Sequence, residues 1–196
     1  METFKAKEFN IPKLEGISEK NIEEHLKLYK GYVNNTNLIF NKLYELKSDP
    51  EKNAYLLGEL QRRLGFEFDG MRNHEYFFAS FEGGKKDINE SSELHKKIVE
   101  DWGSFEMFLN HFKFVATTRG IGWTMLYFDK LTNKLILTWV DEHHLGQLTG
   151  LSPILALDMW EHAYVYDYPT SEKKKYIEAF FNNLNWQKIE ENFKTA

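Results

Sequence analysis

The segment "ALDMWEHAYVYDY", residues 156–168, places an aspartate, a glutamate and a histidine among large aromatic and aliphatic residues. An unpaired charge in an apolar setting carries a high desolvation cost, so the Asp158 carboxylate requires a cationic partner. His162 follows four residues later, a spacing that lets both side chains approach one point. We expect the remaining partners to come from distant segments, so this stretch decides how the chain must fold.

The composition limits the kinds of protein that this chain can be. Its 196 residues, 42% of them apolar, are enough for one domain or for two small lobes that share an interface. The formal charge of −5 and the lack of an arginine-rich run argue against nucleic acid as a partner. Cysteine is absent, which excludes disulfides and thiolate zinc sites, so a metal must use imidazole and carboxylate ligands.

The sequence also bears on location. The N-terminal residues "METFKAKEFNIPKLEG" lack the apolar run of a signal peptide, and no segment reaches membrane-spanning length. We therefore expect a soluble cytoplasmic protein without a membrane partner.

The first half of the chain predicts a helical hairpin. A long amphipathic helix begins at the N-cap Ser18, and its seam residues recur at spacings of three and four through residues 22–43. The segment "KSDPEKN" breaks the helix, and a second seam runs through 57–81, interrupted at Glu67. Two long helices with a short connection pack antiparallel.

The second half predicts helices around a small sheet. After the turn-rich boundary "EGGKKDINESS" come two helices divided near Gly103, a β-hairpin ("GWTMLYFD" and "KLILTWV"), a possible third strand ("ILALDM") and two closing helices. The expected class is α+β: an N-terminal long α-hairpin packed on a C-terminal lobe of helices around a three-stranded antiparallel sheet. The expected domains are residues 1–86, with two metal ligands, and 87–196, with the other two.

Four residues stand out as possible metal ligands. His74 lies on the seam of the second helix, and His25 lies beside the seam of the first. Each alone is more often a hydrogen-bonded core histidine than a ligand, and Asp158 alone is equally consistent with a helix N-cap. Together with His162 they form an N3O set suited to iron, manganese or zinc.

Other metal motifs do not match. A His-Glu-x-x-His zinc site fails because His74 and Glu75 are followed only by aromatic residues, and no histidine has the glutamate three residues earlier that a di-iron bundle requires. A mononuclear site remains.

The same segments resemble the iron/manganese superoxide dismutases over nearly the whole chain. "DMWEHAY", residues 158–164, matches the family's Asp-x-Trp-Glu-His-Ala-Tyr signature. "NHEYFF", "GIGWTMLYFD" and "NNLNWQKI" resemble its second-ligand segment, its sheet-opening strand and its closing helix, in the same order.

The resemblance implies metal ligands at His25, His74, Asp158 and His162. The first is open, because the family places that histidine eight residues before the tyrosine of "YVNN", whereas His25 precedes Tyr32 by seven. Ungapped alignment puts Glu24 there. We favour His25, because seven residues nearly complete two helical turns and keep both groups on one face.

The resemblance also implies groups around the metal. Tyr32 matches a gateway tyrosine, and Trp123 and Trp160 match aromatic residues that wall the site.

One further side chain of the family holds the metal-bound solvent. Gly70 cannot serve in this role, so we assign it to His143, with His144 and Gln147 as competitors.

In the family, Glu161 reaches a ligand histidine of a neighbouring subunit. The resemblance thus implies at least a homodimer, with Glu161 and Tyr164 at its interface; dimer and tetramer both remain possible. Two positions depart from the family pattern, Phe78 in place of tryptophan and Val165 in place of tyrosine.

The implied activity is superoxide dismutation, with superoxide anion as substrate and one iron or manganese ion per subunit cycling by one electron. The alternative is a catalytically silent metal-binding or structural homologue, suggested by Phe78 and Val165. The choice of metal is open. Because the net charge opposes an anionic substrate, local positive charge must offset it, and Lys173, Lys174 and Lys175 are candidates.

Overall fold

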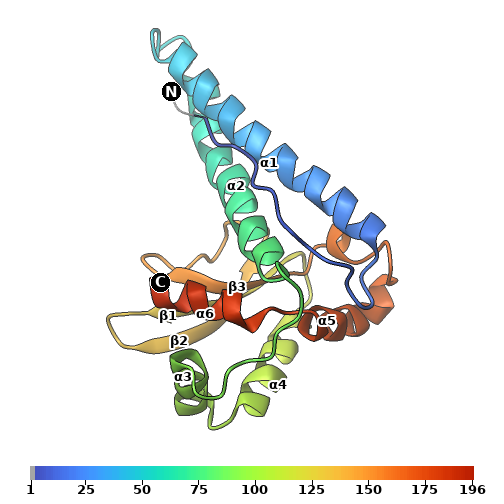
Figure 1. Ribbon diagram of the computed structural model, residues 1–196. Helices are drawn as coiled ribbons and strands as arrows, with labels where there is room; N and C mark the ends of the chain where they lie inside the picture. The colour runs from blue at the N-terminus through green and yellow to red at the C-terminus, as the bar shows by residue number, and fades with distance from the viewer. Residues whose placement is uncertain (1–2) are drawn as a thin grey trace.

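The computed structural model describes residues 3–196, and its elements follow the predicted order (Figure 1). The N-terminal half forms the predicted antiparallel hairpin of α1 (Glu19–Leu46) and α2 (Ala54–Ala79). The remaining elements are α3 (Glu93–Trp102), α4 (Phe105–Ala116), β1 (Gly122–Asp129), β2 (Lys134–Asp141), β3 (Ser152–Asp158), the 3-10 helices η1 (Glu161–Ala163) and η2 (Thr170–Glu172), α5 (Lys173–Asn182) and α6 (Trp186–Thr195).

The start of α1 is fixed by its predicted cap. The Ser18 hydroxyl accepts a hydrogen bond from the Asn21 N–H at 3.1 Å, and the Ser18 N–H donates to Asp167 Oδ2 at 2.9 Å. The first bond satisfies a free N–H of the first turn, and the second ties this end of the helix to the segment after η1.

Helix α2 buries the polar residue of its seam. Glu67 interrupts the run of apolar residues as expected, and its side chain is buried while the helix continues through it. Arg63, four residues earlier, donates to its carboxylate at 2.9 Å. An ion pair at this helical spacing allows an acid to occupy a buried face.

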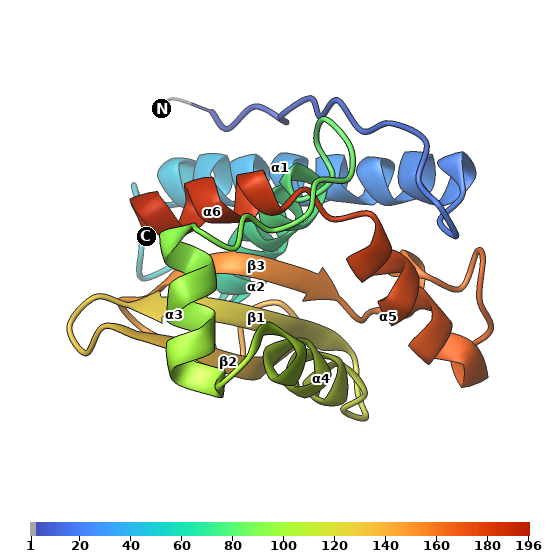
Figure 2. The same cartoon turned by 60° about the horizontal axis from the view of Figure 1, so that its bottom comes forward.

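The sheet places the end of β3 beside α2. Its strand order is β2-β1-β3, antiparallel throughout, which confirms the predicted hairpin and third strand. Trp123 at the start of β1 is paired with Asp158 at the end of β3. Figure 2 shows α3 and α4 in front of the sheet and α2 behind it. Because α2 packs on β3, the two halves meet directly, and the division into domains 1–86 and 87–196 stays a prediction.

An extended N-terminal segment lies along the hairpin (Figure 1). The Phe4 N–H donates to Asn37 Oδ1 at 2.8 Å, and Asn37 Nδ2 donates back to the Phe4 carbonyl at 2.9 Å. The Lys7 N–H donates to the Tyr29 hydroxyl at 2.9 Å. Among residues 3–196 no helix has the length and apolar character needed to cross a membrane.

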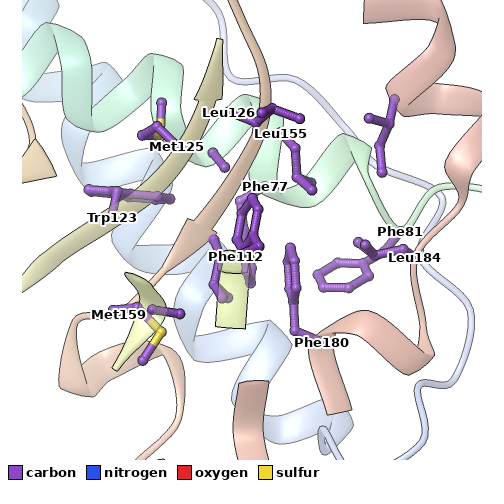
Figure 3. Close-up of a cluster of buried hydrophobic side chains, with 14 of the residues drawn as sticks. Phe77, Phe81, Phe112, Trp123, Met125, Leu126, Leu155, Met159, Phe180 and Leu184 are labelled. Atoms are coloured by element: carbon purple, nitrogen blue, oxygen red, sulfur yellow. The ribbon is translucent and has the colours of Figure 1, made fainter. Parts of the chain in front are cut away.

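Aromatic rings join the hairpin to the C-terminal helices (Figure 3). The Phe77 ring of α2 stacks on Phe180 of α5 with centroids 5.7 Å apart, and its centroid is 5.1 Å from that of Phe81. Phe77 is 1% exposed. It therefore ties α2 to α5 through the centre of the core.

Phe77→Ala should lower the free energy of unfolding by about 3–5 kcal/mol, because it removes buried apolar surface and leaves a cavity. Urea unfolding measures the change. Phe114→Ala is the control, because that ring is 75% exposed on α4 and its loss should change stability by about 0.5 kcal/mol or less. Equal losses for the two variants would contradict this account of the core.

Candidate metal centre

Four side chains from separate elements meet where the hairpin packs on the C-terminal half. His25 comes from α1, His74 from α2, Asp158 from the end of β3 and His162 from η1. One ligand atom from each lies within 4.8 Å of the others. The Nε2 atoms of the three histidines converge on Asp158 Oδ2, at 3.2 Å for His25, 3.4 Å for His74 and 3.1 Å for His162.

Local hydrogen bonds orient two of these donors, Asp158 and His74. Asp158 Oδ1 accepts the Trp160 N–H at 2.9 Å, which leaves Oδ2 for the three imidazoles. The Asp158 carbonyl accepts the Tyr176 hydroxyl at 2.9 Å, which anchors the strand end to α5. His74 Nδ1 donates to the Gly70 carbonyl at 2.5 Å, so its Nε2 presents a lone pair toward the cluster.

The electrostatics of the cluster favour metal-binding protonation states. Burial lowers the pKa of His25 and lowers that of His74 strongly, so both imidazoles are neutral. Burial alone would raise the pKa of Asp158, but the His162 and His25 imidazoles beside it bring that pKa well below its ordinary value. A neutral imidazole and an ionised carboxylate are the forms that coordinate a metal.

The cluster fits one metal cation. His74 Nε2 is buried without a hydrogen-bond partner, and its lone pair faces the ionised Asp158 oxygen 3.4 Å away. Two electron-rich atoms in this arrangement repel unless a cation lies between them. Three imidazole nitrogens with one carboxylate oxygen suit iron, manganese or zinc.

The structure brings His25, and not Glu24, into the cluster. Glu24 forms ion pairs with Lys20 at 2.5 Å and Lys27 at 2.9 Å, and its side chain is 41% exposed. Helix α1 is regular over its whole length, so the seven-residue step places His25 and Tyr32 on one face.

Tyr32 and His143 form a hydrogen-bonded pair beside the cluster. Trp123 Nε1 donates to His143 Nδ1 at 3.0 Å, so the proton of the neutral His143 ring is on Nε2. That atom lies 2.7 Å from the Tyr32 hydroxyl oxygen, to which it donates. Burial lowers the pKa of His143 to about 4 and raises that of Tyr32 above its ordinary value, so both are neutral near pH 7.

Aromatic rings wall the site. Trp160 stacks on His143 with centroids 4.8 Å apart, and Trp123 meets His74 edge-on at 5.0 Å. Phe66, whose centroid is 4.6 Å from that of His143, was missed in the sequence. Its signal was an apolar residue eight positions, about two turns, before His74, but the neighbouring Gly65 and buried Glu67 obscure the periodicity there.

The two competitors of His143 lie differently. The Nδ1 of His144 is 4.0 Å from Glu142 Oε2, and its ring lies against Gly65. Gln147 donates through its amide to the His143 carbonyl at 2.9 Å, and Asn73 Nδ2 donates to the same carbonyl at 3.0 Å. Gln147 and Asn73 therefore hold the backbone of His143.

The predicted interface residues, and the two residues that depart from the family pattern, differ in their exposure. Glu161 is exposed, whereas Tyr164 is buried with its ring centroid 5.4 Å from that of Tyr176. Phe78 is buried 4.9 Å from the His25 ring, and Val165 is 47% exposed.

Comparison with known proteins gives consistent matches. The family profile described as iron/manganese superoxide dismutases, C-terminal domain, matches residues 90–192. The chain is 37% identical over 189 residues to an iron superoxide dismutase of Aquifex aeolicus, covering 93% of this chain and 87% of that protein. It is 36% identical over 165 residues to a manganese superoxide dismutase of Mycobacterium kansasii, covering 83% of this chain and 98% of that protein. It is 30% identical over 177 residues to an iron superoxide dismutase of Tetrahymena pyriformis, covering 88% of this chain and 89% of that protein.

Proposed function

Because the chain belongs to the iron/manganese superoxide dismutase family, we propose that His25, His74, Asp158 and His162 hold its catalytic iron or manganese ion. The protein is an oxidoreductase that converts superoxide to oxygen and hydrogen peroxide. The observation that carries the ligand proposal is the convergence of three imidazole Nε2 atoms within 3.4 Å of one buried Asp158 oxygen.

The ligand set prepares the site for an anionic substrate. When bound, the iron or manganese ion supplies the one-electron oxidation and reduction of superoxide. Asp158 contributes one negative charge and the neutral imidazoles contribute none, so a divalent or trivalent ion keeps net positive charge toward superoxide. The aromatic walls of Trp123 and Trp160 exclude water and strengthen this attraction.

Tyr32 and His143 are placed to handle protons. Formation of hydrogen peroxide consumes two protons, and a neutral tyrosine hydroxyl is a suitable donor. Because Tyr32 Oη accepts the His143 Nε2–H at 2.7 Å, its own hydrogen is free to point to an anion in front of the cluster. Tyr32 is partly exposed, so solvent can return the proton.

Loading of the metal-free protein with Fe²⁺, Mn²⁺ or Zn²⁺ tests the function. We expect one ion per chain in each case, and dismutase activity with iron or manganese but none with zinc, which has no redox chemistry. Metal analysis and a superoxide assay provide the two measurements. Full loading without activity for both redox metals would instead favour a silent homologue.

His143→Ala should reduce dismutase activity about 10- to 100-fold, the usual cost of losing a group that supports a metal site, while metal content stays near one ion per chain. His144→Ala is the control, because that ring lies against Gly65 and is expected to leave activity unchanged. Activity lost in the His144 variant and kept in the His143 variant would reverse this assignment.

A homodimer, the cytoplasmic location and the interface role of Glu161 and Tyr164 belong to the same proposal. Glu161 is exposed next to His162, whose side chain is 22% exposed, so a partner chain can reach this edge of the site. Burial of Tyr164 against Tyr176 supports the backbone beneath it.

Sedimentation should give at least twice the 23.3 kDa chain mass, and Glu161→Arg should raise the dissociation constant about tenfold or more by removing a buried interfacial charge pair. Glu106→Arg makes the same charge change at an exposed position of α4, and it should leave the mass of the assembly unchanged. A fully active wild-type monomer would exclude the interface role.

A further inference from the structure

The net charge of −5 repels superoxide, so the approach to the site requires a local source of positive potential. We propose that Arg63, fixed over the Phe66 ring by Glu67, is the cation that draws superoxide toward the Tyr32–His143 side of the site. This inference rests on the proposed function and assigns a steering residue to it.

The Arg63 side chain is held in one orientation. Its guanidinium carbon lies 3.7 Å from the centroid of the Phe66 ring, and its Nε donates to Glu67 Oε1 at 2.9 Å. Glu67 is only 6% exposed, and its other oxygen accepts a hydrogen bond from Asn35 Nδ2 at 3.2 Å. The Arg63 side chain is 52% exposed. The negative end of the pair is therefore buried in the helix interface and the positive end faces solvent.

Phe66 connects this cation to the proton-handling pair. The centroid of its ring lies 4.6 Å from that of His143 and 6.1 Å from that of Tyr32. One aromatic ring thus separates the guanidinium from both groups, a distance within the screening length of about 10 Å at 0.1 M salt. The Arg63 charge acts on both groups. It lowers the pKa of His143, in the same direction as burial does, and it lowers the pKa of Tyr32, against the rise that burial causes.

The lysines suggested by the sequence lie elsewhere. Lys173 Nζ donates to the Thr118 carbonyl at 3.0 Å, and the charges that act on it are those of Glu161 and Arg119. Lys175 forms an ion pair with Glu172 at 2.8 Å. The positive charge of Lys173 is therefore opposed by Glu161, and that of Lys175 by Glu172.

Arg62 offers a matched control for Arg63. It is the residue just before Arg63 on the same helix, and its side chain is 73% exposed. Like Arg63, it pairs with a carboxylate one turn away, in this case that of Glu59. It makes no contact with Phe66 among the aromatic contacts of residues 3–196. The two variants Arg63→Gln and Arg62→Gln therefore change the net charge equally and differ in position.

The test measures kcat/KM for superoxide against ionic strength in metal-loaded enzyme. At low salt Arg63→Gln should lower kcat/KM roughly 3- to 10-fold, less than the about 10- to 1,000-fold effect of a whole charged cleft because only one charge is removed, and flatten its salt dependence. The dissociation constant of azide, an unreactive anion, should rise by a similar factor in calorimetry, with metal content unchanged. Arg63→Lys should keep most of the rate and the salt dependence, and Arg62→Gln should match the wild type.

Each other outcome decides against the inference. Equal losses in the Arg62 and Arg63 variants would mean that only net charge matters, and a loss in Arg63→Lys as large as in Arg63→Gln would mean that Arg63 acts by packing on Phe66. An unchanged Arg63→Gln enzyme would exclude steering by this residue alone. If wild-type protein loaded with iron or manganese shows no activity, the proposed function fails and not merely the role of Arg63.

Discussion

Asp158→Asn is expected to remove metal binding and dismutase activity together. The substitution keeps the side-chain volume but deletes the only carboxylate among the four clustered donors. A neutral amide neither balances the charge of the ion nor coordinates as strongly, so activity should fall more than about 100-fold, beyond the cost of losing an outer partner. Metal analysis and the superoxide assay measure both effects.

Thermal unfolding provides an independent reading of the same variant. A ligand present at 100 times its dissociation constant stabilises a protein by about 2.7 kcal/mol, so iron or manganese should raise the melting temperature of the wild type and not that of Asp158→Asn. Asp141→Asn is the control, because Asp141 ends strand β2 of the same sheet but is exposed. A metal-dependent stabilisation retained in Asp158→Asn would refute the ligand assignment.

The second large effect concerns His25, the proposed first ligand. His25→Ala should leave a cluster of three donors, with metal occupancy reduced about tenfold or more and activity close to background. It should also destabilise the metal-free protein by several kcal/mol, of order 2–4, because the imidazole is fully buried against Phe77 and Phe78.

Glu24→Gln is the decisive partner of that variant. Its side chain forms surface ion pairs with Lys20 and Lys27, and such pairs contribute little to stability. Metal content and activity should therefore match the wild type. Retention of metal in His25→Ala together with its loss in Glu24→Gln would show that Glu24 is the first ligand, as the ungapped alignment implies.

Much of the fold could be predicted because local signals agree with tertiary packing. Ser18 caps α1 as its sequence indicates, and the β-branched and aromatic runs form the three strands. Glu67 interrupts the apolar seam of α2 as expected, but its burial was not predicted, because it depends on the ion pair with Arg63 one turn away. Hydrophobic periodicity alone does not reveal such a pair.

The surroundings of the cluster were less predictable, because they depend on the loop between β2 and β3. His143 was predicted from the sequence to lie beside the metal, but its support by Gln147 and Asn73 runs through a backbone carbonyl, which has no sequence signature. Glu142 adopts a positive φ of 51° just before His143, a conformation that non-glycine residues rarely adopt. The His143 ring that follows this turn is held by its hydrogen bonds with Trp123 and Tyr32.

The length of the hairpin has a practical consequence for attaching labels or supports. Twenty-one residues separate His25 from the end of α1 at Leu46, which corresponds to about 30 Å of helix. The connection between α1 and α2 therefore projects far from the ligands (Figure 1). A fluorophore, affinity tag or surface tether inserted at residues 48–52 should leave catalysis intact. This connection is therefore a suitable attachment site for immobilising the enzyme.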